Sequence, residues 1–282
     1  MSTRVRDVLM QELGALRHEP TQKRIRATLG GETVIDSVRA LLVWEPKRIV
    51  PTYAVPVEDV NGEVGPAPAG NAAEPRTGGM PADAPRLGDR PVLDPSIPFS
   101  VHTAEGERLA IRAPGGHREA GAFRPLDAAL DGYVLLDFDA FDAWYEEDER
   151  NVAHPRDPFH RIDIVHSSRH VRAELDGELL AESSSPYLLF EPPLPVRYYL
   201  APEDVRTDLL RPSDTRTFCA YKGQASYWSL AGAEDVAWSY PEPLREAAEI
   251  TDRIAFFNER VELVVDGQRL ERPVTPWSRR EA

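Results

Sequence analysis

A short segment in the second half of the chain combines a thiol, an amine, a glycine and several aromatic rings. It reads Cys219-Ala220-Tyr221-Lys222-Gly223 and is followed by Ser226-Tyr227-Trp228. A lysine ammonium acts as a compact point charge toward phosphate or carboxylate groups, and aromatic rings commonly form the walls of small-molecule pockets. A glycine also lets the backbone approach a ligand closely. The segment therefore predicts a pocket for a small polar or anionic metabolite.

Lys222 is notable because this chain uses arginine almost everywhere else. Only three of its 33 basic residues are lysines, namely Lys23, Lys47 and Lys222. A lysine at this point indicates a role for a compact amine, although a strand–turn–strand with a solvated lysine and core aromatic residues fits the pattern equally well. The candidate ligand-binding residues are Cys219, Tyr221, Lys222, Gly223, Ser226, Tyr227, Trp228 and the earlier aromatic residue Tyr199.

Two other functions stay open at this point. In the first, Cys219 or Lys222 acts as the nucleophile or acid–base group of an enzyme on a small-molecule substrate. That chemistry needs a base beside the thiol or a shifted pKa, and the sequence names no such base. In the second, the chain is a structural or interaction protein that recruits a partner through residues 61–90.

Metal and cofactor sites are not expected. Cys219 is the single cysteine, which excludes an intrachain disulfide and a zinc site made of several thiolates. Four histidines lie within seventeen residues, but prolines intervene and we interpret them as surface residues: His154, His160, His166 and His170. The acidic run 137–149 invites a two-metal interpretation, but Gly115-Gly116 stands too far before it, so we expect a solvated strand face and an acidic loop.

The chain contains an internal repeat. Residues 26–56 align without a gap onto residues 172–202, and twelve of the aligned pairs are identical. The identical pairs include Glu45 with Glu191 and Tyr53 with Tyr199, and a looser alignment farther on places His102 opposite Cys219. The repeat predicts a tandem duplication of one domain.

Each copy begins with the pattern of a β-hairpin. Residues 24–29 and 170–175 alternate apolar and polar side chains, and Gly30-Gly31 and Asp176-Gly177 follow as tight turns. The apolar runs 41–44 and 187–190 each stop at a Glu-Pro pair, where proline removes a ladder donor. We therefore predict a mainly β (α+β) fold made of two tandem small antiparallel β domains. Further strands are expected at 50–55, 196–200, 227–230, 236–240, 253–257 and 261–265.

The domain boundaries follow from the repeat. We expect a short N-terminal helix within residues 1–20, a first copy over 21–152 and a second copy over 153–282. Residues 61–90 are rich in proline, glycine and alanine and contain few large apolar side chains, so we expect a mobile loop inside the first copy.

Several motifs resemble the domain-of-unknown-function family numbered 427. They are the segments 219–223 and 226–228, together with Tyr198-Tyr199, 202–205, 238–243 and 142–148. The resemblance covers about residues 21 to 275 and has the tandem form found in actinobacteria. It implies a small β-tent domain, in which two sheets meet at an angle around a pocket. The first copy has Val101–Gly106 in place of the cysteine–lysine motif, so the site is expected in the second copy. Related tent-like families carry zinc on cysteine pairs, which this chain lacks.

Composition narrows the function classes. The chain has 33 basic and 47 acidic residues and a formal charge of −14, which disfavours nucleic acid as a partner. No apolar run approaches the roughly 20 residues of a membrane helix, and the N-terminus has no apolar signal core. We therefore expect a soluble cytoplasmic protein without membrane or nucleic-acid partners, with a small molecule as its possible ligand and an unknown protein partner.

Overall fold

The computed structural model describes residues 2–68, 80–81 and 83–278. Strands make up 47% of the structure and helices 10%, which confirms the prediction of a mainly β protein. The chain separates into two compact units. Unit 1 comprises Met1–Pro85 and Pro91–Asp157, and unit 2 comprises Arg86–Arg90 and Pro158–Ala282. No helix in the described part of the chain is long and apolar enough to cross a membrane.

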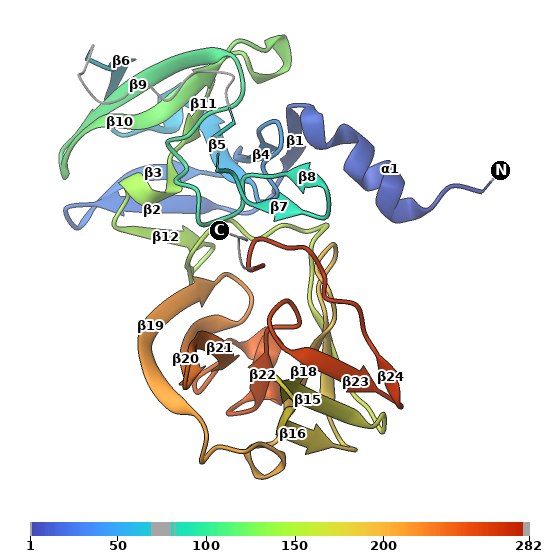
Figure 1. Ribbon diagram of the computed structural model, residues 1–282. Coiled ribbons are helices and arrows are strands. Elements are labelled where there is room, and N and C mark those ends of the chain that lie inside the picture. The colour runs from blue at the N-terminus through green and yellow to red at the C-terminus, as the bar shows by residue number, and fades with distance from the viewer. Residues whose placement is uncertain (1, 69–79, 82, 279–282) are drawn as a thin grey trace. The chain divides into compact units, whose positions relative to one another are not determined.

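Unit 1 contains one large and one small antiparallel sheet (Figure 1). The seven-stranded sheet has the order β1 (Arg17–Pro20), β4 (Leu41–Trp44), β5 (Thr52–Pro56), β11 (Tyr133–Leu136), β10 (Gly116–Pro125), β9 (Gly106–Ala113) and β6 (Glu63–Pro66). The four-stranded sheet has the order β13 (Glu149–Asn151), β12 (Ala143–Glu146), β2 (Ile25–Leu29) and β3 (Glu32–Ser37). Before β1 lie the helix α1 (Val5–Gln11) and the 3-10 turn η1 (Glu12–Gly14).

Unit 2 contains a second pair of antiparallel sheets. Its seven-stranded sheet has the order β14 (Asp163–His166), β17 (Tyr187–Phe190), β18 (Arg197–Leu200), β22 (Ile254–Phe256), β21 (Ala233–Ser239), β20 (Gly223–Leu230) and β19 (Arg211–Cys219). Its four-stranded sheet has the order β16 (Glu178–Ser183), β15 (Val171–Leu175), β23 (Glu262–Val265) and β24 (Gln268–Arg269). Strand by strand, this order follows that of unit 1.

The predicted hairpins are present in both units. Strands β2 and β3 are joined at Gly30 and Gly31, and β15 and β16 at Asp176 and Gly177; all four turn residues have positive φ. Glycine adopts this backbone conformation without a side-chain clash, and aspartate tolerates it better than most residues. The local turn chemistry therefore fixed these two connections.

Strand register moves one gap of the internal repeat. Leu41 on β4 faces Ala54 on β5, whereas its counterpart Tyr187 on β17 faces Tyr199 on β18. Tyr199 thus occupies the place of Ala54, and the pairing of Tyr199 with Tyr53 is wrong by one residue. The reason is that the loop between β17 and β18 is one residue shorter than the loop between β4 and β5.

The alignment of His102 with Cys219 is also wrong. Leu109 on β9 faces Ala122, and Trp228 on β20 faces Ala237. Both alanines face the last residue of the next strand, β11 or β22, so Leu109 and Trp228 are equivalent. Seven residues before each lie His102 and Tyr221, which makes these two residues the matching pair.

The loop expected over residues 61–90 contains secondary structure. Strand β6 is the edge strand next to β9, where Pro66 faces Leu109 as Pro212 of β19 faces Trp228. The loop prediction is therefore wrong at Glu63–Pro66. Two further short strands, β7 (Arg86–Leu87) and β8 (Arg90–Pro91), pair with each other. Residues 69–79 and 82 lie outside the described part of the chain.

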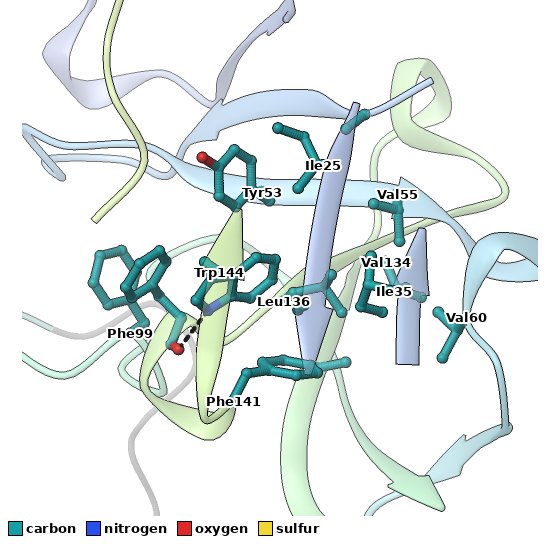
Figure 2. Close-up of a cluster of buried hydrophobic side chains, with 14 of the residues drawn as sticks. Ile25, Ile35, Tyr53, Val55, Val60, Phe99, Val134, Leu136, Phe141 and Trp144 are labelled. Atoms are coloured by element: carbon teal, nitrogen blue, oxygen red, sulfur yellow. Dashed lines mark hydrogen bonds between the residues drawn. The ribbon is translucent and has the colours of Figure 1, made fainter. Parts of the chain in front are cut away.

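The main core of unit 1 lies between its two sheets (Figure 2). Trp144 of the small sheet lies against Tyr53 of the large sheet, with ring centroids 5.0 Å apart. The indole Nε1 of Trp144 donates a hydrogen bond of 2.9 Å to the carbonyl of Phe138, which satisfies its one polar group. The equivalent core of unit 2 joins residues such as Ala173 and Leu263 of the small sheet to residues of the large sheet.

The other face of the seven-stranded sheet of unit 2 carries a separate aromatic cluster, which we call the aromatic face. Its members are the buried residues Leu189, Tyr199, Ala225, Trp238, Tyr240, Ala247, Ile250, Ala255 and Phe257, with Ile162, Ile164, Tyr187, Tyr227 and Trp277 packed around them. Because successive strand residues point to opposite faces, Tyr198 joins the main core while Tyr199 joins the aromatic face.

Candidate functional site

The centre of the candidate site is the carboxylate of Glu191, immediately after β17. Three apolar residues of that strand bring the chain into the interior, and the strand stops because Pro192 has no donor for the ladder. Glu191 is left buried at the strand end. Its Oε2 forms an ion pair with Nζ of Lys222, and its Oε1 lies 3.2 Å from Nε2 of His160.

The turn between β19 and β20 positions Lys222. Cys219 and Gly223 face each other at the end of this ladder, and the turn between them is buried. The amide of Leu244 donates a hydrogen bond of 3.1 Å to the carbonyl of Lys222. Gly223 has a φ of +91°, and a Cβ there would lie 3.3 Å from the Leu244 nitrogen. Glycine is therefore required by both the backbone conformation and the close approach of a neighbouring segment.

Electrostatic pairing keeps both central groups charged. Burial alone would raise the pKa of Glu191, but Lys222 and His160 lower it further than burial raises it. Burial alone would lower the pKa of Lys222, but Cys219 and Glu191 raise it above its ordinary value. The site thus presents an ammonium and a carboxylate, and Lys222 is not a neutral amine near pH 7.

Cys219 and Tyr221 flank the ion pair differently. The Cys219 thiol is free and partly exposed. Tyr221 is buried, and its ring lies parallel to the imidazole of His160 with centroids 5.9 Å apart. The guanidinium of Arg161 lies 5.1 Å from the Tyr221 ring centroid and pairs with Glu246 at 2.5 Å. Tyr221 is therefore a packed wall of the site, whereas Cys219 is accessible.

Tyr199 and Tyr227 lie on the aromatic face. The Tyr199 hydroxyl accepts a hydrogen bond of 3.0 Å from Nε1 of Trp238, and burial raises the pKa of Tyr199. The hydroxyl of Tyr227 shares a hydrogen bond of 2.9 Å with the Thr217 hydroxyl. Both rings are held in place, and Tyr199 is close enough to Lys222 to influence the pKa of that lysine.

Ser226 and Trp228 do not lie with the other predicted residues. Ala225 and Tyr227 belong to the aromatic face, so the alternating residues Ser226 and Trp228 point to the opposite side of β20. Trp228 packs against the main core of unit 2, and its Nε1 donates to the Ser239 hydroxyl at 3.2 Å. The inclusion of these two residues in the site is corrected by the strand geometry.

Sequence reasoning missed Glu191 and His160 as site residues. Glu191 had a signal, because a glutamate directly after an apolar strand is placed where burial requires a partner. The surface interpretation of the histidines is wrong for His160, which contacts Glu191, and for the buried His154. It holds for His166 and His170, which are exposed.

Unit 1 closes the equivalent glutamate in another way. Oε1 of Glu45 lies 2.9 Å from Nδ1 of His102, and its Oε2 accepts hydrogen bonds from the amides of Thr103 and Ala104. Nε2 of His102 lies 3.3 Å from Asp137. Burial lowers the pKa of His102, but the two carboxylates raise it to about 9. The carboxylate of Glu45 is thus enclosed by an internal imidazolium and two amides.

Within the described residues, no group of three or more histidine, cysteine, aspartate or glutamate side chains is arranged to hold a metal ion. The chemistry of the candidate site is therefore that of its own thiol, ammonium, carboxylate and imidazole.

Comparison with known proteins bears on unit 2. No curated protein matches the chain. Residues 163–267 contain Glu191 and the whole cysteine–lysine turn. This part of the chain matches the family described as "Domain of unknown function (DUF427)", which supports that family for the second unit.

Proposed function

We propose that unit 2 binds a small polar or anionic molecule at the end of β17, next to Glu191 and Lys222. The observation that carries the proposal is the buried, charged Glu191–Lys222 pair beside a partly exposed thiol. A buried ion pair is a poor source of stability, because desolvation offsets its attraction. It does supply one donor and one acceptor to a ligand. An anionic group fits the cationic side, where Lys222 and the imidazole of His160 converge.

We also propose that the chain is a tandem duplication of one tent-like domain. The matching strand order of the two units supports this. So does a repeated polar pair: Ser37 donates to Asp59 at 2.6 Å, and Ser183 donates to Asp204 at 2.6 Å. In this view unit 1 carries a sealed form of the site, since His102 and two amides enclose Glu45, and unit 2 carries the binding form.

A thermal-shift screen tests the binding proposal. Wild type, Lys222→Arg and the control Lys47→Ala are heated with sugar phosphates, nucleotides, carboxylic acids and amino acids. A ligand at a hundred times its Kd stabilises the folded state by about 2.7 kcal/mol. We expect a ligand whose shift is weakened at least tenfold in affinity by Lys222→Arg and unchanged by Lys47→Ala. A shift that is the same in all three proteins would contradict this site.

A second candidate function is thiol chemistry on a small substrate. It is favoured by the accessible Cys219, which lies close enough to the Lys222 ammonium to raise the pKa of Lys222. A cation beside a cysteine favours the reactive thiolate. Alkylation of Cys219 by iodoacetamide at pH 7 should then be faster than that of free cysteine, and slower in Lys222→Met. A rate at or below that of free cysteine in the wild type argues against this function.

A further inference from the structure

Arg197 of β18 occupies a buried cage of aromatic rings in unit 2. Its guanidinium forms two hydrogen bonds of 2.7 Å with the carboxylate of Glu259. Three ring centroids surround it, those of Trp238 at 5.5 Å, Phe257 at 5.8 Å and Trp277 at 5.4 Å. A desolvated cation over aromatic faces is a favourable arrangement. One of the three walls, Trp277, comes from outside the sheet.

Trp277 belongs to residues 273–278, which we call the cap segment. The hydroxyl of Thr275 donates a 2.5 Å hydrogen bond to Oε1 of Glu259, so the segment completes both the cage and its counter-ion. The carbonyl of Trp277 accepts a hydrogen bond of 3.2 Å from Nε of Arg260. The turn is closed by Ser278, whose amide donates to the Thr275 carbonyl at 3.0 Å.

The cap segment is attached mainly through side chains. It follows β24 and contains no strand, so no ladder of backbone hydrogen bonds joins it to either sheet. Its contacts with Arg197 and Glu259 depend on Thr275 and Trp277, while Val274 is exposed. Segments held by few buried contacts are those that open locally while the rest of a domain stays folded.

Unit 1 covers the corresponding place with a segment that is held more firmly. Strand register makes Leu136 equivalent to Phe256, so Asp139, three residues later, corresponds to Glu259. Asp139 accepts a hydrogen bond of 3.2 Å from the amide of Phe99, and the Phe99 ring lies 5.0 Å from the guanidinium of Arg48.

The guanidinium of the fully buried Arg48 donates to three backbone carbonyls of the covering segment, those of Ile97, Pro98 and Val101. Both units therefore place an arginine–aromatic pair and a carboxylate under a covering segment. In unit 1 the buried arginine grips the backbone of that segment. In unit 2 the buried Arg197 grips Glu259 instead, and the covering segment touches it with one ring.

The cap segment is in continuous contact with the candidate site. Trp277 lies 6.4 Å from Phe257 and Phe257 lies 4.4 Å from Trp238, measured between ring centroids. Trp238 donates to the hydroxyl of Tyr199, which lies beside the Glu191–Lys222 pair. Movement of Trp277 would therefore change the packing of the aromatic face that supports the site.

From this arrangement we infer that the cap segment is a latch that opens and closes reversibly while both sheets of unit 2 stay folded. Its two fastenings are the Thr275–Glu259 hydrogen bond and the Trp277 ring on Arg197. Opening exposes Trp238, Phe257 and the Arg197–Glu259 pair at once. This inference does not depend on the identity of the ligand or on the proposed binding function.

Native-state amide hydrogen exchange tests the latch in the full chain. The reporting amides are those of Thr275, Trp277 and Ser278, each of which donates a hydrogen bond within the segment. We expect these amides to exchange through an opening that is faster, and less sensitive to denaturant, than the exchange of the amides in β18 and β21. If all of them exchange in one common transition, the segment is part of the core and the latch is wrong.

A pair of variants gives a second readout. Thr275→Val keeps the side-chain shape and removes the hydrogen bond to a charged acceptor, so the segment amides should exchange about tenfold faster or more. The amides of β18 and β21 should be unchanged. The matched control is Val274→Ala at an exposed position of the same segment, which should leave both sets of amides unchanged. Equal acceleration in the segment and in the sheets by Thr275→Val would overturn the proposal.

Discussion

Lys222 forms an ion pair with the buried carboxylate of Glu191, a residue that lies 31 positions earlier in the chain. The equivalent glutamate in unit 1, Glu45, is held by His102 and two backbone amides. The same strand-end carboxylate thus has two solutions within one chain. One of them leaves an ammonium next to an accessible thiol, and the other encloses the charge completely.

The Glu191–Lys222 pair should behave as a coupled unit in stability measurements. Lys222→Met leaves a buried carboxylate without its main partner and should lower the free energy of unfolding by about 3 kcal/mol. Adding Glu191→Gln should recover much of that loss, which a double-mutant cycle in urea would measure. Lys47→Met serves as the control for loss of a lysine. Additive effects of the two changes would show that the pair is not coupled.

His102 should make the stability of unit 1 depend on alkaline pH. Its pKa is raised from 6.5 to about 9, so its contribution is fully present below pH 6.5 and is lost as the pH rises through 9. The full contribution is on the order of 3 kcal/mol. Urea unfolding followed from pH 6 to 10 should show this decline, and His102→Gln should remove it. A decline of the same size in the variant would mean that other groups cause it.

Gly223→Ala should destabilise unit 2 more than Gly232→Ala does. Both glycines have positive φ, +91° and +80°, so both substitutions add backbone strain of about 1 kcal/mol. Only at Gly223 would the new methyl group press on a neighbouring backbone, at Leu244, because nothing lies within 4 Å of a Cβ at Gly232. Thermal unfolding of the two variants makes the comparison. Equal shifts would show that the contact with Leu244 is relaxed without cost.

Trp228 should prove to be a core residue and not a ligand contact. Trp228→Ala removes a large ring from the main core of unit 2 and should cost about 3 kcal/mol of stability. It should leave the alkylation rate of Cys219 and any ligand shift unchanged under conditions where the variant is folded. Tyr227→Phe is the companion variant on the aromatic face. A loss of ligand affinity in Trp228→Ala with little loss of stability would reverse this assignment.

The local features of this fold could be read from the amino-acid sequence. Gly30-Gly31 and Asp176-Gly177 specify their turns because few residues adopt positive φ easily. The runs before Glu45 and Glu191 specify strands that end at a Glu-Pro pair, because alternation and proline act over a few residues. The mainly β architecture and the internal repeat follow from such local signals, and the cysteine–lysine turn was singled out from its composition.

Tertiary structure alone decided which of these residues meet. A one-residue difference in loop length puts Tyr199, and not Tyr198, on the aromatic face, and alternation along β20 sends Trp228 away from Lys222. The partners of Lys222 come from β17 and from the segment before β14, far away in sequence. Long-range pairing depends on the summed packing of whole sheets. A shift of one residue there reverses the side of every side chain that follows in the strand, which no short stretch of sequence reveals.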